Sequence, residues 1–229
     1  MRLLLIMFLC PSFSCSNAQV TVSGIAGWNS NSIKMVNWGD ISANDHGGND
    51  GWQLGGHVEY KLSKWFIYSG AELNKNDFFI HYYSLDGNTV ATYHPLYLSI
   101  PAGFGYQFNL NRNVALRFYG GAYASVGVGG KLRSAKMVCG DFGPCLDSRP
   151  RTITNANIKY GNGTNNDVAP GNNGLQIGFG IKTWKLVEIS CMYNAGLSNI
   201  YPHDFKSPRL TLTTVALTAK IDIVTFKRK

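Results

Sequence analysis

The chain is poor in charged residues, since only 15% of its 229 residues are Asp, Glu, Lys or Arg, where a soluble domain has about a quarter. After the N-terminal segment it has no apolar run of helix-spanning length, which excludes a protein that crosses a membrane by helices. Apolar residues do not recur at the helical spacing of 3.6 either. Glycine and aromatic residues are abundant instead, with 26 Gly, 12 Tyr, 12 Phe and 5 Trp. This composition is typical of strands that bend and lie against lipid.

Residues 1–18 have the pattern of a secretory signal peptide. Arg2 provides a positive charge, an apolar run follows, and Ser16-Asn17-Ala18 places small residues at the cleavage positions. The apolar run is far shorter than the roughly 20 residues of a membrane anchor. We therefore expect cleavage after Ala18 and an exported domain at 19–229. Lipidation at Cys15 is the alternative, although the residues before it lack the usual aliphatic side chain.

Removal of the signal leaves three cysteines. Cys139 and Cys145 lie close together in a polar segment, which makes them a disulfide candidate in an oxidising compartment. Closing so short a loop stabilises a protein by about 2–3 kcal/mol. Cys191 lies within a strand pattern, and we expect a free thiol there. The sequence contains neither Cys-x-x-Cys nor His-Glu-x-x-His, so it predicts no zinc site and no cofactor.

Alternation with a period of two recurs in segments of about ten residues. In segment 51–62, Trp52, Leu54, Val58, Tyr60 and Leu62 share one face, while Gln53, His57, Glu59 and Lys61 share the other. Aromatic residues at both ends of the apolar face favour contact with lipid over a soluble core. Seven further segments fit this pattern: 20–28, 65–73, 97–108, 114–128, 175–183, 187–197 and 209–224. The two faces of the last are less distinct, which predicts a β-bulge.

The connections between these segments alternate in length. Those at 63–64, 109–113 and 184–186 are short, whereas those at 29–50, 74–96, 129–174 and 198–208 are long and polar. Within the second long one, Asp86-Gly87-Asn88 predicts a hairpin that extends beyond the membrane.

Together these features predict an all-β fold, an eight-stranded antiparallel up-and-down transmembrane β-barrel in the cell outer membrane, with short periplasmic turns and long extracellular loops. Strands of ten residues, tilted about 45°, span roughly 23 Å, close to the apolar band of such a barrel. A soluble secreted β-sandwich is the alternative, but it has no reason to place every long loop at one end.

Three short motifs resemble a known family. Residues 97–106, Tyr-Leu-Ser-Ile-Pro followed by Ala-Gly-Phe-Gly-Tyr, resemble the Tyr-Leu-x-Ile-Pro strand of the PorT-like outer-membrane barrels common in Bacteroidota. Residues 193–199 are similar to that family's Tyr-x-x-Gly-Leu-x-Asn stretch, and residues 174–180 to the strand before it. The resemblance implies an eight-stranded barrel in the outer membrane, with no shared catalytic residues. The chain departs from the family by its long 129–174 loop and by the basic residues that follow Phe226.

The polar faces of the predicted strands carry six charged residues that we expect inside the barrel: Glu59, Lys61, Glu72, Arg117, Lys182 and Glu188. An eight-stranded barrel is only wide enough to be filled by side chains. Buried charges in such an interior must pair with one another. We therefore expect a polar plug of salt bridges and hydrogen bonds in the lumen, with a gated channel or a proton path as the alternative.

Two groups of residues allow an enzymatic or metal-binding interpretation. His203, Asp204 and Ser207 are the residue types of an acyl hydrolase, but they lie in a loop flanked by prolines, which is a poor platform for catalysis. His81 and His94 are more simply explained as polar neighbours across a surface hairpin than as metal ligands. We expect no enzyme, and a hydrolase or transferase that modifies lipid A acyl chains is the alternative.

The long loops are where a function would lie on a rigid barrel. The formal net charge is +8, and the loop at 131–172 is basic whereas that at 29–50 is acidic. An exported chain with no basic helical stripe is not expected to bind nucleic acid. We expect a surface module for binding, adhesion or structure. Its expected partners are outer-membrane lipid, above all lipopolysaccharide phosphates, and another envelope protein docked on the loops.

Overall fold

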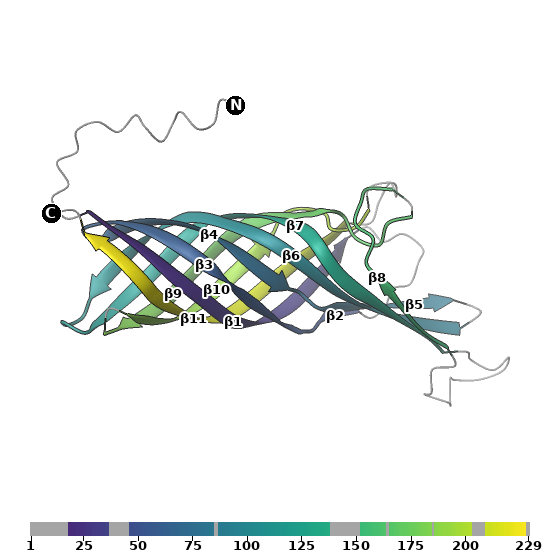
Figure 1. Ribbon diagram of the computed structural model, residues 1–229. Coiled ribbons are helices and arrows are strands. Elements are labelled where there is room, and N and C mark those ends of the chain that lie inside the picture. Colours follow the sequence, from purple (N-terminus) through teal and green to yellow (C-terminus); the bar gives the residue numbers. More distant parts are fainter. Residues whose placement is uncertain are drawn as a thin grey trace, which may run out of the picture.

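The computed structural model describes residues 18–36, 46–84, 87–137, 152–163, 165–184, 186–202 and 209–227. Within them, eight antiparallel strands form one closed ring, and β1 pairs with β11 to close it (Figure 1). The strands in ring order are β1 (Ala18–Val36), β3 (Asp50–Leu62), β4 (Trp65–Lys75), β6 (Gly87–Asn109), β7 (Val114–Met137), β9 (Gly171–Thr183), β10 (Val187–Gly196) and β11 (Arg209–Lys227). The predicted eight-stranded barrel is confirmed, and the alternative of a two-sheet sandwich is wrong. Among the described residues, no helix has the length and apolarity needed to cross a membrane.

Three further strands lie outside the ring, in the long connections between the predicted strands. They are β2 (His46–Gly48), β5 (Phe78–Ser84) and β8 (Thr152–Asn157). β5 pairs with the first half of β6, β8 pairs with the last part of β7, and β2 pairs with β5. Together with the ends of β6 and β7 they form a protruding sheet, ordered β2-β5-β6-β7-β8, at the end of the barrel opposite the short turns (Figure 1). The predicted hairpin is confirmed by the pairing of Ser84 with Gly87.

Two strands contain an extra residue that shifts their register. In β11, Asp222 and Val224 pair with consecutive residues of β1, so Ile223 forms the bulge that the sequence predicted. In β7, Gly127 and Gly129 pair with consecutive residues of β6, so Val128 forms a second bulge. Because strand side chains alternate between two faces, one extra residue moves every later side chain to the opposite face.

The outer surface of the ring is an apolar belt. Each strand contributes exposed apolar side chains, for example Trp28, Leu54, Ile67, Ile100, Phe118, Ile177, Ile189 and Leu217. Trp28 lies opposite Trp52 at one border of the belt, and the Trp65 ring meets the Tyr106 ring edge-on, 4.8 Å between centroids, at the other. The two borders are separated by about ten residues of strand, or roughly 23 Å along the barrel axis. A closed ring with this surface is a membrane-spanning barrel, since its strands pair around the whole circumference and the outside is lipid-compatible.

Candidate functional site

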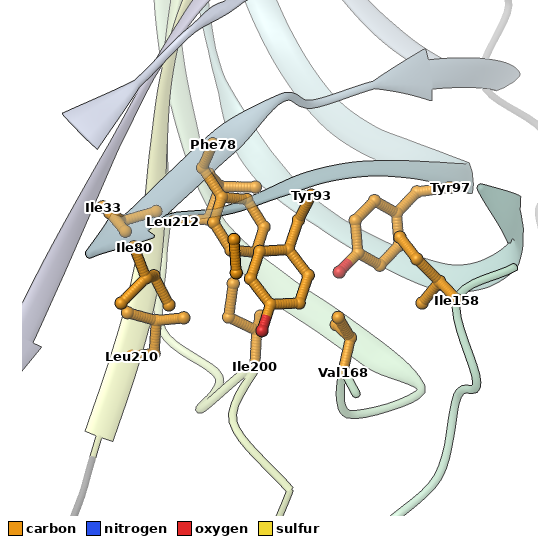
Figure 2. Packing of buried hydrophobic residues seen from close by; sticks show 11 residues of the cluster. Ile33, Phe78, Ile80, Tyr93, Tyr97, Ile158, Val168, Ile200, Leu210 and Leu212 are labelled. Atoms are coloured by element: carbon orange, nitrogen blue, oxygen red, sulfur yellow. The ribbon is translucent and has the colours of Figure 1, made fainter. Parts of the chain in front are cut away.

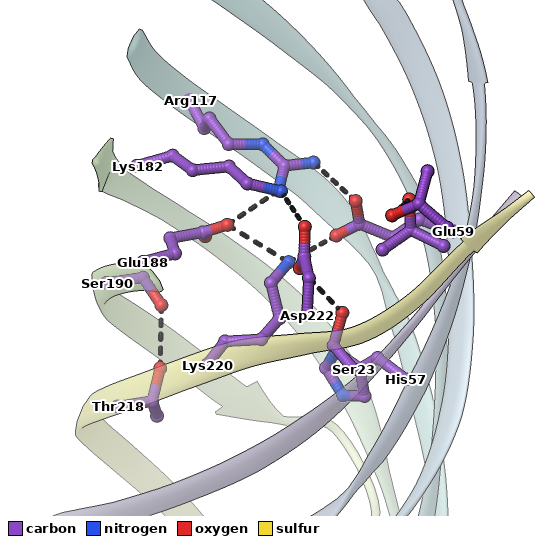
Figure 3. Close-up of polar contacts among 12 residues, drawn as sticks. Ser23, His57, Glu59, Arg117, Lys182, Glu188, Ser190, Thr218, Lys220 and Asp222 are labelled. Carbon is purple, nitrogen blue, oxygen red and sulfur yellow. Dashed lines mark hydrogen bonds and ion pairs between the residues drawn. The ribbon is translucent and has the colours of Figure 1, made fainter. Parts of the chain in front are cut away.

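The centre of the lumen is a cluster of four buried charges from four strands (Figure 3). The Arg117 guanidinium of β7 lies 2.8 Å from the Glu59 carboxylate of β3 and 2.5 Å from the Glu188 carboxylate of β10. The Lys220 ammonium of β11 contacts Glu59 and lies 3.0 Å from Glu188. All four side chains are at most 4% exposed. Two cations thus balance two carboxylates, which is the condition for keeping such groups charged away from water.

Aromatic rings pack around this cluster and fill the centre of the lumen. The Arg117 guanidinium carbon lies 3.9 Å from the centroid of the Phe66 ring, which is a close cation–π contact. The Phe66 and Tyr119 rings meet edge-on with centroids 5.5 Å apart. Gly105 of β6 makes room for this packing, because a Cβ at that position would lie 2.1 Å from the Phe66 ring and 2.5 Å from the Phe118 carbonyl oxygen. The barrel wall therefore has no side chain at the position where the Phe66 ring packs against it.

Further ion pairs lie on both sides of the cluster. The Lys182 ammonium lies 2.5 Å from the Asp222 carboxylate, to which the Ser23 hydroxyl also donates at 2.9 Å. The His57 ring lies 2.6 Å from the Glu72 carboxylate. One cavity of about 30 Å³ lies between the central cluster and the His57–Glu72 pair. A second cavity of about 30 Å³ lies on the other side of Glu72, beside Asn74 and Ser99. Each has room for about one or two water molecules.

The structure places all six predicted plug residues in the lumen, although in separate contacts. Glu59, Arg117 and Glu188 meet at the centre, Glu72 contacts His57, and Lys182 contacts Asp222. Lys61 lines a cavity of about 510 Å³ that also reaches the short turn between β6 and β7. Sequence reasoning missed Lys220 and Asp222. The two-residue alternation along β11 could have revealed them, because it places both in one row of inward-facing residues. That row is Leu210, Leu212, Thr214, Ala216, Thr218, Lys220 and Asp222.

An apolar cluster, the cap, lies above the polar lumen at the end that carries the protruding sheet (Figure 2). Its buried members come from β1, β5, β6, β11 and two loops: Ile33, Phe78, Ile80, Ala91, Tyr93, Tyr97, Ile158, Val168, Ile200, Leu210 and Leu212. The Phe78 and Tyr93 rings stack with centroids 4.9 Å apart. The cap thus joins the protruding sheet to the barrel and covers the lumen beneath it.

Tyr93 of the cap and Tyr82, which packs against the cap, have raised pKa values. The Tyr82 and Tyr93 hydroxyl groups lie 3.4 Å apart. Burial raises the pKa of each phenol above its ordinary value near 10, because the charged phenolate loses its hydration there. The cap therefore favours both tyrosines in their neutral form.

The remaining predicted residues are the cysteines and the candidate hydrolase residues. Cys139 and Cys145 lie outside the described residues, as do His203, Asp204 and Ser207. Cys191 is a free thiol on β10.

The two hairpin histidines are not neighbours, which corrects that interpretation. The register places His81 opposite Val90, and the His94 ring lies 2.7 Å from the Asp77 carboxylate. Among the described residues, no three His, Cys, Asp or Glu side chains gather as they would around a metal ion.

Comparison with known proteins finds solved structures whose fold is similar to that of this chain. No family model and no curated protein matches the chain. Solved structures that resemble it include the attachment invasion locus protein Ail of Yersinia pestis, at 16% identity, TM-score 0.39 and coverage of 90% of this chain and 99% of Ail. Neisserial surface protein A is 12% identical, with TM-score 0.43 and coverage of 89% and 99%. The outer membrane protein OprG of Pseudomonas aeruginosa is 10% identical, with TM-score 0.43 and coverage of 93% and 97%.

Proposed function

We propose that the protein is an outer-membrane barrel that anchors the protruding sheet at the cell surface, where it acts as a binding, adhesion or structural module. The observation that carries this proposal is the contrast between a lumen that is closed at its centre and by the cap, and strands that continue far past the belt. β7 runs from Val128 at the border of the belt to Met137, about 30 Å of strand outside the membrane. A barrel built only to conduct has no use for this extension.

The filling of the lumen supports a binding module over a pore. The central charges are paired, aromatic rings pack beside them, and the cap covers the end nearest the protruding sheet. Diffusion pores are built from wider rings with a water-filled interior. The same pairing supports binding over catalysis, because the carboxylates at the centre of the lumen form ion pairs with Arg117 and Lys220.

The apolar belt and the connections support the proposed orientation. Closed barrels with short turns on one side and long connections on the other are characteristic of bacterial outer membranes, where the short turns face the periplasm. The signal peptide at 1–18 and membership of the PorT-like family, which the motifs in 97–106 and 193–199 favour, are part of the same proposal. Lipopolysaccharide and other envelope proteins are the proposed partners of the outer end.

Single cysteines at the two ends of the barrel test this proposal. Asn155→Cys lies on β8 in the protruding sheet, and Lys64→Cys lies on the short turn between β3 and β4; both side chains are exposed. A membrane-impermeant maleimide should label Asn155→Cys on intact cells and Lys64→Cys only after the outer membrane is opened. The parent chain, treated in the same way, corrects for its own cysteines. Equal labelling of both variants on intact cells, or recovery of the protein in the soluble fraction, would contradict the proposal.

A measurement of conductance separates the module from a pore. Purified protein, with folding verified by heat-modifiable migration on a gel, should give no stable current steps in a planar lipid bilayer. Regular steps from the unmodified protein would favour the channel alternative.

A further inference from the structure

The bulge at Val128 decides which way the basic residues of β7 point. Before the bulge, Arg117, Tyr119 and Ser125 are buried in the lumen. Without the extra residue, positions 131 and 133 would continue that inward row. With it, Lys131 and Arg133 are exposed on the outer face, while Leu132 packs against the cap. The bulge therefore turns two cations toward the lipid side of the barrel.

The neighbours of these two cations are also hydrogen-bond donors. Lys131 pairs with His94 on β6 and with Asn157 on β8. Arg133 pairs with Thr92 on β6 and with Asn155 on β8. Directly opposed residues in antiparallel strands lie on one face, with Cβ atoms about 4.5–5.5 Å apart. Six polar side chains thus form two adjacent rows on the outer face, which we call the basic face.

The described residues provide no carboxylate that forms an ion pair with either cation, Lys131 or Arg133. The nearby Asp77 carboxylate is only 8% exposed and is held by the His94 ring at 2.7 Å and the Lys75 ammonium at 3.0 Å. Within the described part of the chain, the basic face therefore presents two cations that have no ionic partner.

The height of the basic face matches the headgroup layer of a membrane. Val126 and Val128 are the last exposed apolar residues of β7 at the border of the belt. For a strand tilted about 45°, Lys131 lies about 7 Å and Arg133 about 12 Å beyond Val128 along the membrane normal. Headgroups occupy roughly 5–8 Å on each side of the hydrocarbon, and both side chains are long enough to reach back into that layer.

We propose that the basic face binds the phosphate of an outer-leaflet lipid headgroup. The inference deepens the proposed function and rests on its orientation, with the protruding sheet outside. A lipid fits better than a free anion because the apolar surface continues directly below: Leu98 pairs with Val126, and Ile100 follows on β6, all exposed. One molecule can thus place its phosphate on Lys131 and Arg133 and an acyl chain along the belt.

The test is a titration of the refolded full-length chain in maltoside micelles, followed by native mass spectrometry. The probe is dioleoyl phosphatidic acid, with dioleoyl phosphatidylcholine for comparison. The double variant Lys131→Gln/Arg133→Gln should bind phosphatidic acid at least tenfold more weakly than the parent, given the usual contribution of a cation at a membrane surface. The matched control Lys64→Gln/Arg112→Gln removes the same charge from exposed turns at the other end and should change the affinity less than twofold.

Three results would overturn the proposal. These are equal weakening in the control, equal affinity of the parent for the two lipids, and displacement of the lipid by millimolar inorganic phosphate, which would indicate a site for free anions. The charge-preserving Lys131→Arg/Arg133→Lys variant should stay within about threefold of the parent. If the double variant does not fold, Arg133→Gln alone should still weaken binding about threefold or more, and an unchanged affinity would reject the site.

Insertion into phosphatidylcholine vesicles separates this inference from the proposed function. Parent and variants should all insert, as judged by heat-modifiable migration. Failure of the parent to insert would reject the outer-membrane function itself. Normal insertion without preference for phosphatidic acid would reject the lipid site alone.

Discussion

Replacing Arg117 with alanine leaves two buried carboxylates, Glu59 and Glu188, to share the single cation of Lys220. Arg117 is 1% exposed and contacts both carboxylates, so the variant buries one uncompensated negative charge. Removing one partner from a buried ion pair costs about 3–5 kcal/mol. Loss of the contact with the Phe66 ring, 3.9 Å away, adds about 1 kcal/mol. The expected loss of about 4–6 kcal/mol is a large share of the usual 5–15 kcal/mol of folding stability.

Urea unfolding in phosphatidylcholine vesicles measures this loss, with the folded fraction read from the heat-modifiable band. The midpoint for Arg117→Ala should fall clearly below that of the parent. A second substitution, Glu188→Gln, restores the balance of one cation to one carboxylate, so the double variant should recover at least half of the loss. Single-channel recordings of Arg117→Ala should remain without current steps, because the aromatic rings and the cap still fill the barrel.

Two outcomes would refute this reasoning. An unchanged unfolding midpoint would show that the ion cluster does not stabilise the barrel. A large rise in conductance would show that Arg117 closes a passage, and the gated-channel alternative would then replace the plug.

Other substitutions test the packing, the cap and the belt. Gly105→Ala should destabilise the barrel by about 1–3 kcal/mol through overpacking, whereas Gly120→Ala, whose Cβ would meet nothing closer than 4.0 Å, should leave the urea midpoint unchanged. Because burial raises the pKa of Tyr82 above 10, the folded cap holds this proton more tightly than the unfolded chain does. The stability that depends on this proton is complete below pH 10 and is lost as the pH rises above 10. Tyr82→Phe should therefore keep the native near-ultraviolet circular dichroism signal to higher pH than the parent. Loss of that signal at a lower pH than in the parent would contradict this. Ile177→Lys, on the lipid side of β9, should cost about 2–4 kcal/mol and lower the inserted fraction, whereas Asn155→Lys should not.

The ring of strands was predictable from the sequence because its physical signal is local. Each strand of the ring has one face in lipid and one in the lumen, so apolar and polar residues alternate within a single segment, as in 51–62. The bulge at Ile223 was also predictable, because an extra residue interrupts that alternation where it occurs. Segment boundaries were less accurate: β6 and β7 continue well beyond the predicted 97–108 and 114–128.

The cap could not be predicted in this way. Its members Ile158, Val168 and Ile200 are single apolar residues in polar connections, so they form no periodic pattern. Their burial arises only when β5 and the ends of β6 and β7 fold over the barrel. In the lumen, the charged residues were visible as inward-facing positions, but their partners depend on which strands lie opposite across the ring.

The pairing of β1 with β11 also has a consequence for how the barrel assembles. These strands share pairs from Gln19 with Lys227 to Val36 with Arg209, the longest sequence separation in the ring. Until the last strand has been made, β1 has an unpaired edge that invites association with other chains. We therefore expect closure to be the last strand pairing of the ring to form, and a chain that lost either strand would expose two open edges at once. We therefore expect the chain to associate with other chains when it is held partly folded away from a bilayer.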